Sequence, residues 1–271
     1  MTHTAAPPPD LRIVPVDHVH PHEEPDSQRL RPLVENLRQA EFIINPPVVA
    51  PVTADQYVVL DGANRIHACT ALAFPHIIVQ VVSYESGFVE LGTWRHVVSD
   101  WTKGDFIEQL RALPEIHMIN SMDARAVAHI LCPDGSITAV RAAVETTHER
   151  NVVLRDLVAV YQQHATLHRT DLTEPDDVWQ LFPDATALVI FPTYQPADII
   201  AAALHHSLLP PGISRHIVHG RALRVNYPLA QLRDGQTSLA AKNDALARWV
   251  QEKFAHRGAR YYAEATYQFD E

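Results

Sequence analysis

Short apolar runs alternate with one amphipathic stretch in the first hundred residues. Runs of Val, Ile and Leu bounded by Pro, Asn or Asp-Gly predict β-strands, and they lie at 11–16, 48–52, 57–60 and 77–82. Leu30, Leu33, Val34 and Leu37 repeat at the spacing of a helix that buries one face, although Pro32 interrupts it. Residues 63–73 have helical composition. This order predicts a compact α+β unit with a mixed sheet over residues 11–100.

The pattern beyond residue 100 favours helices. They are predicted at 101–113, 123–131, 152–164, 196–206 and 239–254, with a single strand at 185–191. His219-Gly220 between two β-rich runs predicts a hairpin over 213–225. We therefore expect a disordered tail at 1–10, a first domain at 11–100 and a mainly helical α+β domain at 101–271.

Composition and charge narrow the class of protein. The 271 residues are 46% hydrophobic and 20% charged, which is typical of a folded chain. A net charge of −10 without a basic patch argues against nucleic acid and anionic lipid as partners. No apolar run reaches the roughly 18 residues of a membrane helix, and the N-terminus lacks the pattern of a signal peptide, so we expect a cytoplasmic protein. Cys69 and Cys132 form neither a CxxC motif nor a disulfide framework.

The segment from Asp61 to Arg65 is the most informative part of the chain. An apolar strand ends in Asp-Gly, and a helix begins at once. The first N–H groups of a helix are unpaired and carry the positive end of its dipole, and a guanidinium suits phosphate oxygens. Gly62, Ala63, Asn64 and Arg65 therefore predict an anion site with Asp61 beside it. The alternative is a structural turn with Asp61 as the helix N-cap and a surface arginine.

This turn resembles the nucleotide-binding motif of the ParB/sulfiredoxin superfamily, and the flanking residues 45–49 and 71–82 match the same pattern. Three branches of the superfamily must be separated. Sulfiredoxins have a nucleophilic cysteine where this chain has Ala63, and Cys69 lies too far into the helix to replace it. Partition proteins of the ParB type continue into a basic helix-turn-helix region, whereas the rest of this chain is acidic.

The third branch fits best, since the chain resembles the free L-serine kinases of the SbnI and archaeal SerK type from about residue 11 onward. Three groups of motifs carry this resemblance. They are 14–17 with His22-Glu23; 61–65 with 93–96; and 211–216 with 220–223 and 227–229. Asn64 departs from the family, which often has His at this position.

The resemblance implies transfer of a phosphoryl group from ATP or ADP to the hydroxyl of free L-serine, giving O-phospho-L-serine. It implies that Glu23 is the general base, although an acid favoured by the helix dipole is the structural alternative. Thr93, Trp94 and His96 are then candidates for the wall of the amino-acid site. Arg215 and His216 are candidates for contact with the transferring phosphoryl group, or else form a charged strand edge.

Some alternatives remain open at this stage. Asp61 is a candidate ligand for Mg²⁺, which we expect as cofactor because few basic residues are present to neutralise the phosphates. His18, His20 and His22 alternate, as metal ligands on one strand face do, but an exposed edge is the favoured interpretation. A nucleotide-responsive regulatory or DNA-associated protein without catalysis is the second functional hypothesis. The sequence does not distinguish ATP from ADP and gives no oligomeric state.

Overall fold

The computed structural model describes residues 6–262. Contacts divide the chain into two units, which are described separately. Unit 1 comprises the residues up to His20, Pro25–Glu90 and those from Ile217 on, and unit 2 comprises Pro21–Glu24 and Leu91–His216. The N-terminal part of the predicted tail, 1–5, lies outside the described residues, and the tail is shorter than predicted because the first strand begins at Asp10.

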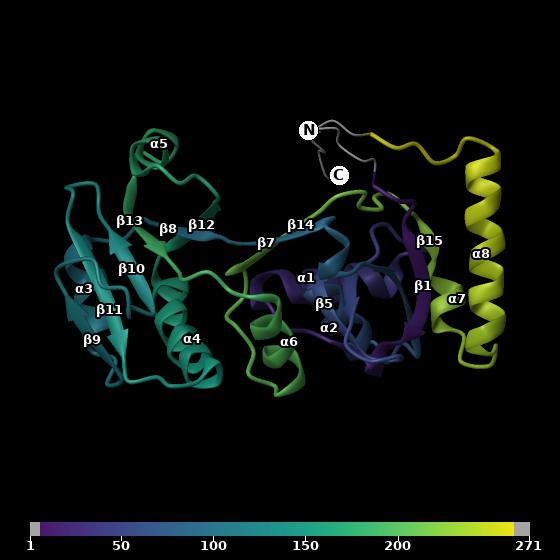
Figure 1. Ribbon diagram of the computed structural model, residues 1–271, viewed down its shortest axis with the longest axis horizontal. Helices are drawn as coiled ribbons and strands as arrows, with labels where there is room; N and C mark the ends of the chain where they lie inside the picture. Colours follow the sequence, from purple (N-terminus) through teal and green to yellow (C-terminus); the bar gives the residue numbers. More distant parts are fainter. Residues whose placement is uncertain (1–5, 263–271) are drawn as a thin grey trace. The chain divides into compact units, whose positions relative to one another are not determined.

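Unit 1 is built on a five-stranded mixed sheet in the order β1-β6-β4-β5-β2. The sequence predicted a mixed sheet and four of these strands, and Figure 1 shows β1 and β5 among them. β1 pairs antiparallel with β6 and β4 antiparallel with β5, whereas β4–β6 and β2–β5 are parallel. The strands are β1 (Asp10–Pro15), β2 (Val19–His20), β4 (Val48–Pro51), β5 (Tyr57–Asp61) and β6 (His76–Val81). Val58, Val59 and Ile77 are fully buried, because helices cover the sheet and the strands need no polar face.

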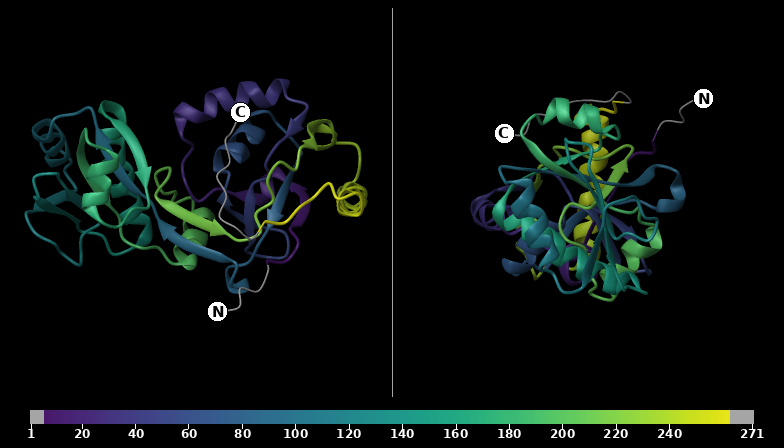
Figure 2. Two further views of the ribbon diagram at one scale, coloured as in Figure 1. Left: turned by 90° about the horizontal axis from the view of Figure 1, so that it is seen from above. Right: turned by 90° about the vertical axis from the view of Figure 1, so that its left-hand side faces the viewer.

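Four α-helices belong to unit 1: α1 (Ser27–Gln39), α2 (Ala63–Ala71), α7 (Leu229–Arg233) and α8 (Leu239–Ala255). α1 continues through Pro32, and the side chain of Asp26 caps it by accepting from the N–H of Gln28. The left view of Figure 2 shows α8 end-on while α1 lies across the view. A short pair joins β3 (Phe42–Ile43) to β15 (Tyr227–Pro228), and two 3₁₀ turns lie at Val16–His18 and Tyr84–Ser86.

Unit 2 differs from the predicted mainly helical domain. Its centre is a six-stranded antiparallel sheet in the order β12-β8-β13-β10-β11-β9. The strands are β8 (Arg95–Ser99), β9 (Ile116–Ile119), β10 (Ala128–Leu131), β11 (Ile137–Ala142), β12 (Thr166–Thr170) and β13 (Ala185–Ile190). The helices are α3 (Lys103–Arg111), α4 (Thr147–His164), α5 (Pro175–Leu181) and α6 (Pro196–Leu204). The α+β class is confirmed, but the description of this half as mainly helical is wrong.

Two local predictions fail for the same reason. The expected helix at 123–131 is absent, and the end of this range forms β10. Its alternate residues Ala128 and Ile130 face the core, and the strand pairs with β11 and β13. The expected hairpin at 213–225 is absent, since β14 (Ser214–Val218) pairs instead with β7 (Val89–Thr93). In both cases pairing with a distant strand overrides the local composition.

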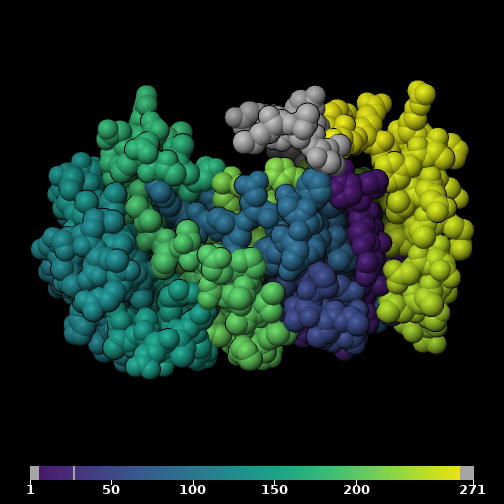
Figure 3. Space-filling model, in the orientation of Figure 1, coloured from purple at the N-terminus to yellow at the C-terminus, as the bar shows by residue number. Residues whose placement is uncertain are grey.

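The structure also corrects the predicted boundary at residue 100. The division falls within β7 and β14, so the chain leaves unit 1, builds unit 2 and returns. Leu229, Leu232 and Leu246 of the returning segment are buried in the core of unit 1. Figure 3 shows the yellow surface of α8 along the purple strip of β1. None of the helices in the described part of the chain is long and apolar enough to cross a membrane.

A side-chain amide joins α8 to the edge of the sheet. Asn243 Oδ1 accepts from the N–H of Ile13 at 2.9 Å, and Asn243 Nδ2 donates to the carbonyl of Ile13 at 2.8 Å. Ile13 is only 1% exposed, so water cannot replace these bonds. The amide thus acts as one further rung of the β-ladder on β1.

We predict that Asn243→Ala lowers the free energy of unfolding by about 2 kcal/mol, because it leaves the N–H and carbonyl of Ile13 buried without partners. Urea denaturation followed by far-UV circular dichroism measures the loss. The matched control is Asp244→Ala on the exposed side of the same helix, which should change stability by less than about 0.5 kcal/mol. Equal effects of the two variants would contradict this role for Asn243.

Candidate active site

The turn that joins β5 to α2 lies in unit 1 and begins at Gly62. Gly62 has φ of 93° and is the N-cap residue of α2, without a side-chain cap. A Cβ atom at this position would lie 2.7 Å from Arg65 Nη2, so only glycine allows the arginine to fold back across the turn. Asp61 is therefore not the N-cap. The space above Gly62, which the sequence suggested for a ligand, holds the Arg65 side chain.

Asp61 instead accepts hydrogen bonds from two arginines. Its Oδ2 lies 2.9 Å from Arg65 Nη2, and Arg221 Nη2 bonds to the same oxygen. One carboxylate thus faces two guanidinium groups, and the cluster keeps one net positive charge beside the N-terminus of α2. Burial lowers the pKa of Arg65, and the Asp61 carboxylate opposes this effect.

The cluster also contains hydrogen-bond donors that lack an acceptor in the described part of the chain. Nε of Arg65 and Nε of Arg221 are buried, and neither has a hydrogen-bond acceptor among the described residues. A buried donor without an acceptor is costly, so such groups call for an explanation. A phosphate group would supply acceptor oxygens and negative charge together.

Arg221 is the functional candidate that sequence reasoning missed. It lies 160 residues from Asp61, and nothing local links the two. Gln80 holds its segment in place: Nε2 donates to the carbonyl of Gly220 at 3.0 Å, and Oε1 accepts from the N–H of Ala222 at 2.8 Å. Gln80 is a polar residue, 3% exposed, in a largely apolar strand, and it was one signal for this contact. The motif at 220–223, which contains Arg221, was another.

The two remaining residues of the turn serve its shape. Ala63 is 5% exposed and belongs to the core of unit 1. Asn64 Oδ1 accepts from the N–H of Asp26 at 3.0 Å, which ties the turn to the start of α1. An amide at the position where the family often has histidine thus has a structural contact of its own.

The donor set around Asp61 does not fit a Mg²⁺ site built by the protein. Two guanidinium groups compete for its carboxylate, and the described residues contain no group of three or more His, Cys, Asp or Glu that could hold a metal ion. We therefore derive no step through a metal at Asp61.

Glu23 lies in unit 2, where backbone bonds fix its segment. The N–H of Glu24 donates to the carbonyl of Leu209 at 2.8 Å, and the N–H of Leu209 donates to the carbonyl of His22 at 2.9 Å. Glu23 Oε2 accepts from the N–H of Gly212 at 2.9 Å. Glu24 turns elsewhere, to Arg155 of α4 at 3.2 Å. The two neighbouring glutamates therefore have different surroundings.

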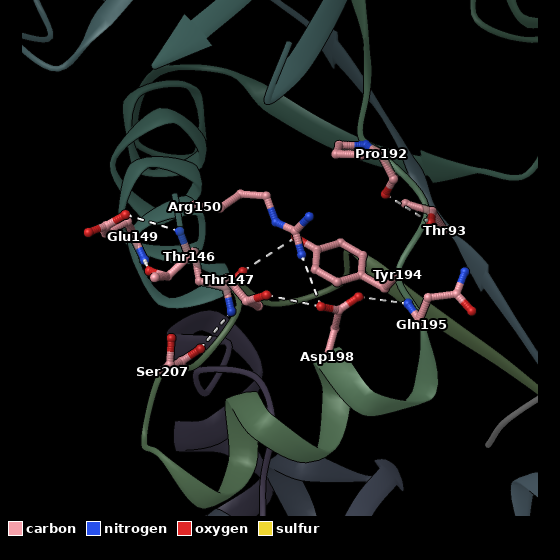
Figure 4. Close-up of polar contacts among 11 residues, drawn as sticks. Thr93, Thr146, Thr147, Glu149, Arg150, Pro192, Tyr194, Gln195, Asp198 and Ser207 are labelled. Atoms are coloured by element: carbon pink, nitrogen blue, oxygen red, sulfur yellow. Dashed lines mark hydrogen bonds and ion pairs between the residues drawn. The ribbon is translucent and has the colours of Figure 1, made fainter. Parts of the chain in front are cut away.

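Three of the predicted substrate residues meet beside β7 and β14 in unit 2. The Arg215 guanidinium lies over the ring of Trp94, 4.6 Å from its centroid, and pairs with Asp171 at 2.8 Å. Thr93 Oγ1 approaches the carbonyl of Pro192 at 3.5 Å (Figure 4). The charge of Arg215 is therefore already balanced by a carboxylate and supported by an aromatic face.

The sequence predicted His96 as part of the wall of the amino-acid site. The structure shows it as a core residue instead. It is fully buried, with Nδ1 2.7 Å from the hydroxyl of Tyr161 and Nε2 2.9 Å from the carbonyl of Gly212. Burial lowers the pKa of His96 to about 4, so the ring is neutral at pH 7. With both nitrogens engaged in the core, the side chain does not reach substrate.

The alternating histidines do not form a metal site. His22 is 1% exposed, and its Nε2 lies 2.6 Å from Ser214 Oγ, whereas His20 bonds to Gln56 in unit 1. His216 contacts His22 edge to face, with 5.5 Å between the ring centroids. His22 and His216 thus support the segment that carries Glu23.

A second polar cluster in unit 2 balances its own charges. Figure 4 shows Arg150 of α4 against the ring of Tyr194 and directed toward Asp198 of α6. Asp198 also accepts from Thr147 Oγ1 at 3.0 Å and from the N–H of Gln195 at 2.9 Å. This cluster joins two helices and is a structural feature.

The structure gives no support for sulfur chemistry. Cys69 and Cys132 are both buried as free thiols. Burial raises the pKa of Cys69 to about 12, so the nucleophilic thiolate is absent at pH 7. This agrees with the separation from the sulfiredoxin branch.

Comparison with known proteins gives relatives of one kind. No family model matches the chain. The ATP-dependent L-serine kinase SbnI of Staphylococcus aureus is 24% identical over 261 residues, which are 95% of this chain and 96% of that protein. The ATP-dependent L-serine kinase of Desulfurococcus mucosus is 35% identical over 83 residues, 30% of this chain and 32% of the relative.

A solved structure shows the same fold. It is a free serine kinase with a glutamate-to-alanine replacement, in complex with AMP. The TM-score is 0.72 at 14% identity, over 86% of this chain and 98% of the other. The resemblance to the free L-serine kinases of the SbnI and SerK type, predicted from the sequence motifs, is therefore confirmed.

Proposed function

We propose that this chain is an ATP-dependent L-serine kinase that transfers the terminal phosphoryl group of ATP to the hydroxyl of free L-serine and forms O-phospho-L-serine. The observation that carries the proposal is the Asp61–Arg65–Arg221 cluster, with its net positive charge and its two buried donors without acceptors. The relatives that match the chain are named ATP-dependent L-serine kinases, and solved free serine kinases bind AMP and ADP. ATP is for this reason the proposed donor.

In this proposal unit 1 binds the nucleotide. A phosphate at the N-terminus of α2 accepts hydrogen bonds from Arg65 and Arg221 and from the first N–H groups of the helix. The carboxylate of Asp61 keeps both guanidinium groups oriented before the nucleotide arrives. Such preorganisation limits the entropy that binding costs. The likeness of this half to the ParB/sulfiredoxin superfamily stays a prediction.

Unit 2 supplies the general base. One oxygen of Glu23, Oε2, is held by the N–H of Gly212, which leaves Oε1 for the serine hydroxyl. As the serine oxygen bonds to the γ-phosphorus, the bond from that phosphorus to the bridging oxygen breaks, ADP leaves, and the hydroxyl proton passes to Glu23. In the related free serine kinase structures a glutamate was replaced by alanine or glutamine, and we propose Glu23 as its counterpart.

The Trp94–Arg215 pair is the proposed site for the amino acid. The guanidinium contacts the indole face and pairs with Asp171 through Nη2, and its other N–H groups are suited to donate to the carboxylate of serine. Thr93, the last residue of β7, directly precedes Trp94 and adds a hydroxyl group. The requirement for Mg²⁺ stays a prediction, and in this proposal the ion would enter with the phosphates of the nucleotide.

A direct assay tests the function. The full chain is incubated with Mg²⁺, L-serine and either ATP or ADP, and the product is detected by mass spectrometry. Phosphoserine with ATP supports the proposal. Tight binding of ATP without phosphoserine would instead favour the regulatory hypothesis, and product with ADP alone would reverse the choice of donor. Omitting Mg²⁺ tests the predicted cofactor.

We predict that Glu23→Gln lowers kcat by about 10²–10⁴-fold, the usual contribution of a positioned base. The amide keeps the size and the contact with Gly212 but does not accept the proton. The Kd for ATP, measured by calorimetry, should stay within about twofold. Glu24→Gln is the matched control, because its carboxylate faces Arg155, and it should keep near-normal kcat. Equal losses in the two variants would contradict the role of Glu23.

We also predict that Arg221→Ala weakens ATP binding by about tenfold to a hundredfold, as expected for loss of a charge-assisted hydrogen bond worth roughly 1.5–3 kcal/mol. Arg65→Ala should act in the same direction. Arg248→Ala removes the same charge from an exposed position on α8 and serves as control. If all three variants bind ATP like the wild type, the anion site is not at this cluster.

A further inference from the structure

Three consecutive carbonyl groups are held in the loop that precedes β14. Arg169 Nη2 lies 3.4 Å from the carbonyl oxygen of Pro211, and His96 Nε2 lies 2.9 Å from that of Gly212. The backbone N–H of Trp94 donates to the carbonyl of Ile213 at 2.8 Å. The donors come from residues on or beside β8 and β12, which pair within the six-stranded sheet. The loop is therefore hydrogen-bonded to residues on or beside two paired strands of this sheet.

A neutral His96 can donate to this loop in only one of its two tautomers. A carbonyl oxygen only accepts, so Nε2 must carry the hydrogen that bonds to Gly212. The lowered pKa keeps the ring neutral, and Nδ1 is then the acceptor of the Tyr161 hydroxyl. Burial raises the pKa of Tyr161, which remains a donor. The carbonyl of Gly212 thus selects the tautomer of His96, and Tyr161 supports this tautomer by donating to Nδ1.

Gly212 links this loop to Glu23 through its backbone N–H. Its φ of 77° is in the left-handed region that favours glycine, and a Cβ atom would come 2.0 Å from Arg169 Cζ. In this conformation its N–H donates to Glu23 Oε2 at 2.9 Å. His96 and Glu23 are accordingly bonded to the two sides of one residue.

We propose that His96 is a positioning residue for Glu23 and acts through Gly212, with the Tyr161 hydroxyl supporting the ring at Nδ1. The inference rests on the proposed function, in which Glu23 is the base. It replaces the sequence hypothesis of a substrate contact at His96 with an indirect role. Other groups around the buried ring are Phe191, whose centroid is 4.9 Å away, and the cation of Arg169, which opposes protonation of His96.

The physical reason lies in the geometry of proton transfer. A base must lie within hydrogen-bond reach of the proton it accepts, and a displacement of about 1 Å can cost a hundredfold in rate. The carboxylate of Glu23 has a flexible side chain, and the bond from Gly212 to Oε2 fixes the direction of Oε1. If Gly212 moves, ATP can still bind in unit 1, but the base is misplaced.

The experiment compares His96→Leu, His96→Gln and Tyr161→Phe by steady-state kinetics with ATP and serine. His96→Leu removes both hydrogen bonds and should lower kcat at least tenfold while the KM for ATP stays within about twofold. His96→Gln retains an amide donor near the position of Nε2 and should restore kcat to within about threefold of wild type. Tyr161→Phe keeps the His96 ring but removes the hydrogen bond at its Nδ1, and it should give an intermediate loss. Ile130→Val, a core change on β10 two strands from β8, is the control for simple destabilisation.

A double-mutant comparison separates positioning from a structural role. Once Glu23→Gln has removed the base, adding His96→Leu should cause little further loss of kcat. Additive losses, or a normal kcat in folded His96→Leu, would overturn the inference. If His96→Leu does not fold, Tyr161→Phe in the Glu23→Gln background is judged by the same criterion.

Failure of the function itself would be recognised separately. A wild-type chain that forms no phosphoserine overturns the kinase proposal. The inference is then decided by crystal structures of the His96→Gln and Tyr161→Phe variants. It is supported if the contact from Gly212 N–H to Glu23 Oε2 persists in His96→Gln and is lost in Tyr161→Phe. A contact unchanged in both variants overturns it.

Discussion

Buried polar side chains must keep their hydrogen bonds when they leave water, and this constraint positions both candidate sites of the molecule. Gln80 has no place in an apolar strand except as the partner of the backbone at Gly220 and Ala222. By satisfying its amide there, the chain brings Arg221 to Asp61. In unit 2, His96 satisfies both ring nitrogens and by doing so fixes the loop that contacts Glu23. The polar groups in the two cores therefore determine where the charged groups lie.

The path of the chain explains why the ends of the sequence matter to the first half. The larger part of unit 2, Leu91–His216, is inserted at β7 and β14, and the residues that follow return to complete unit 1. Asn243 pairs with the backbone of β1, and Leu246 fills the same core. The turn between β5 and α2 thus depends on contacts with residues that are more than 150 positions away. A fragment that ends near residue 100 lacks Arg221 and the helix that covers β1.

Local patterns predicted those elements that are stabilised by local contacts. The four longer strands of the unit 1 sheet, the turn at Gly62 and several amphipathic helices were evident because apolar spacing and glycine conformations act over a few residues. The sheet of unit 2 was missed, since β10 looks helical in composition and becomes a strand only between β11 and β13. The candidate site divides in the same way. Arg65 was predicted from its motif, whereas Arg221 and the core position of His96 follow from contacts across more than 60 residues.

The proposed function requires a chain of net charge −10 to bind an anionic nucleotide, and this depends on the local charge at the turn. At physiological ionic strength, charges are screened beyond about 8 Å, so distant carboxylates contribute little at the turn. The charges that count there are two guanidinium groups, one carboxylate and the N-terminus of α2, and their sum is positive. Partial burial strengthens each of these interactions relative to the surface. Asp61 lowers the net charge at the turn but orients both arginines. In the proposed function, the weaker attraction for the anion is offset by a fixed geometry that suits one phosphate group.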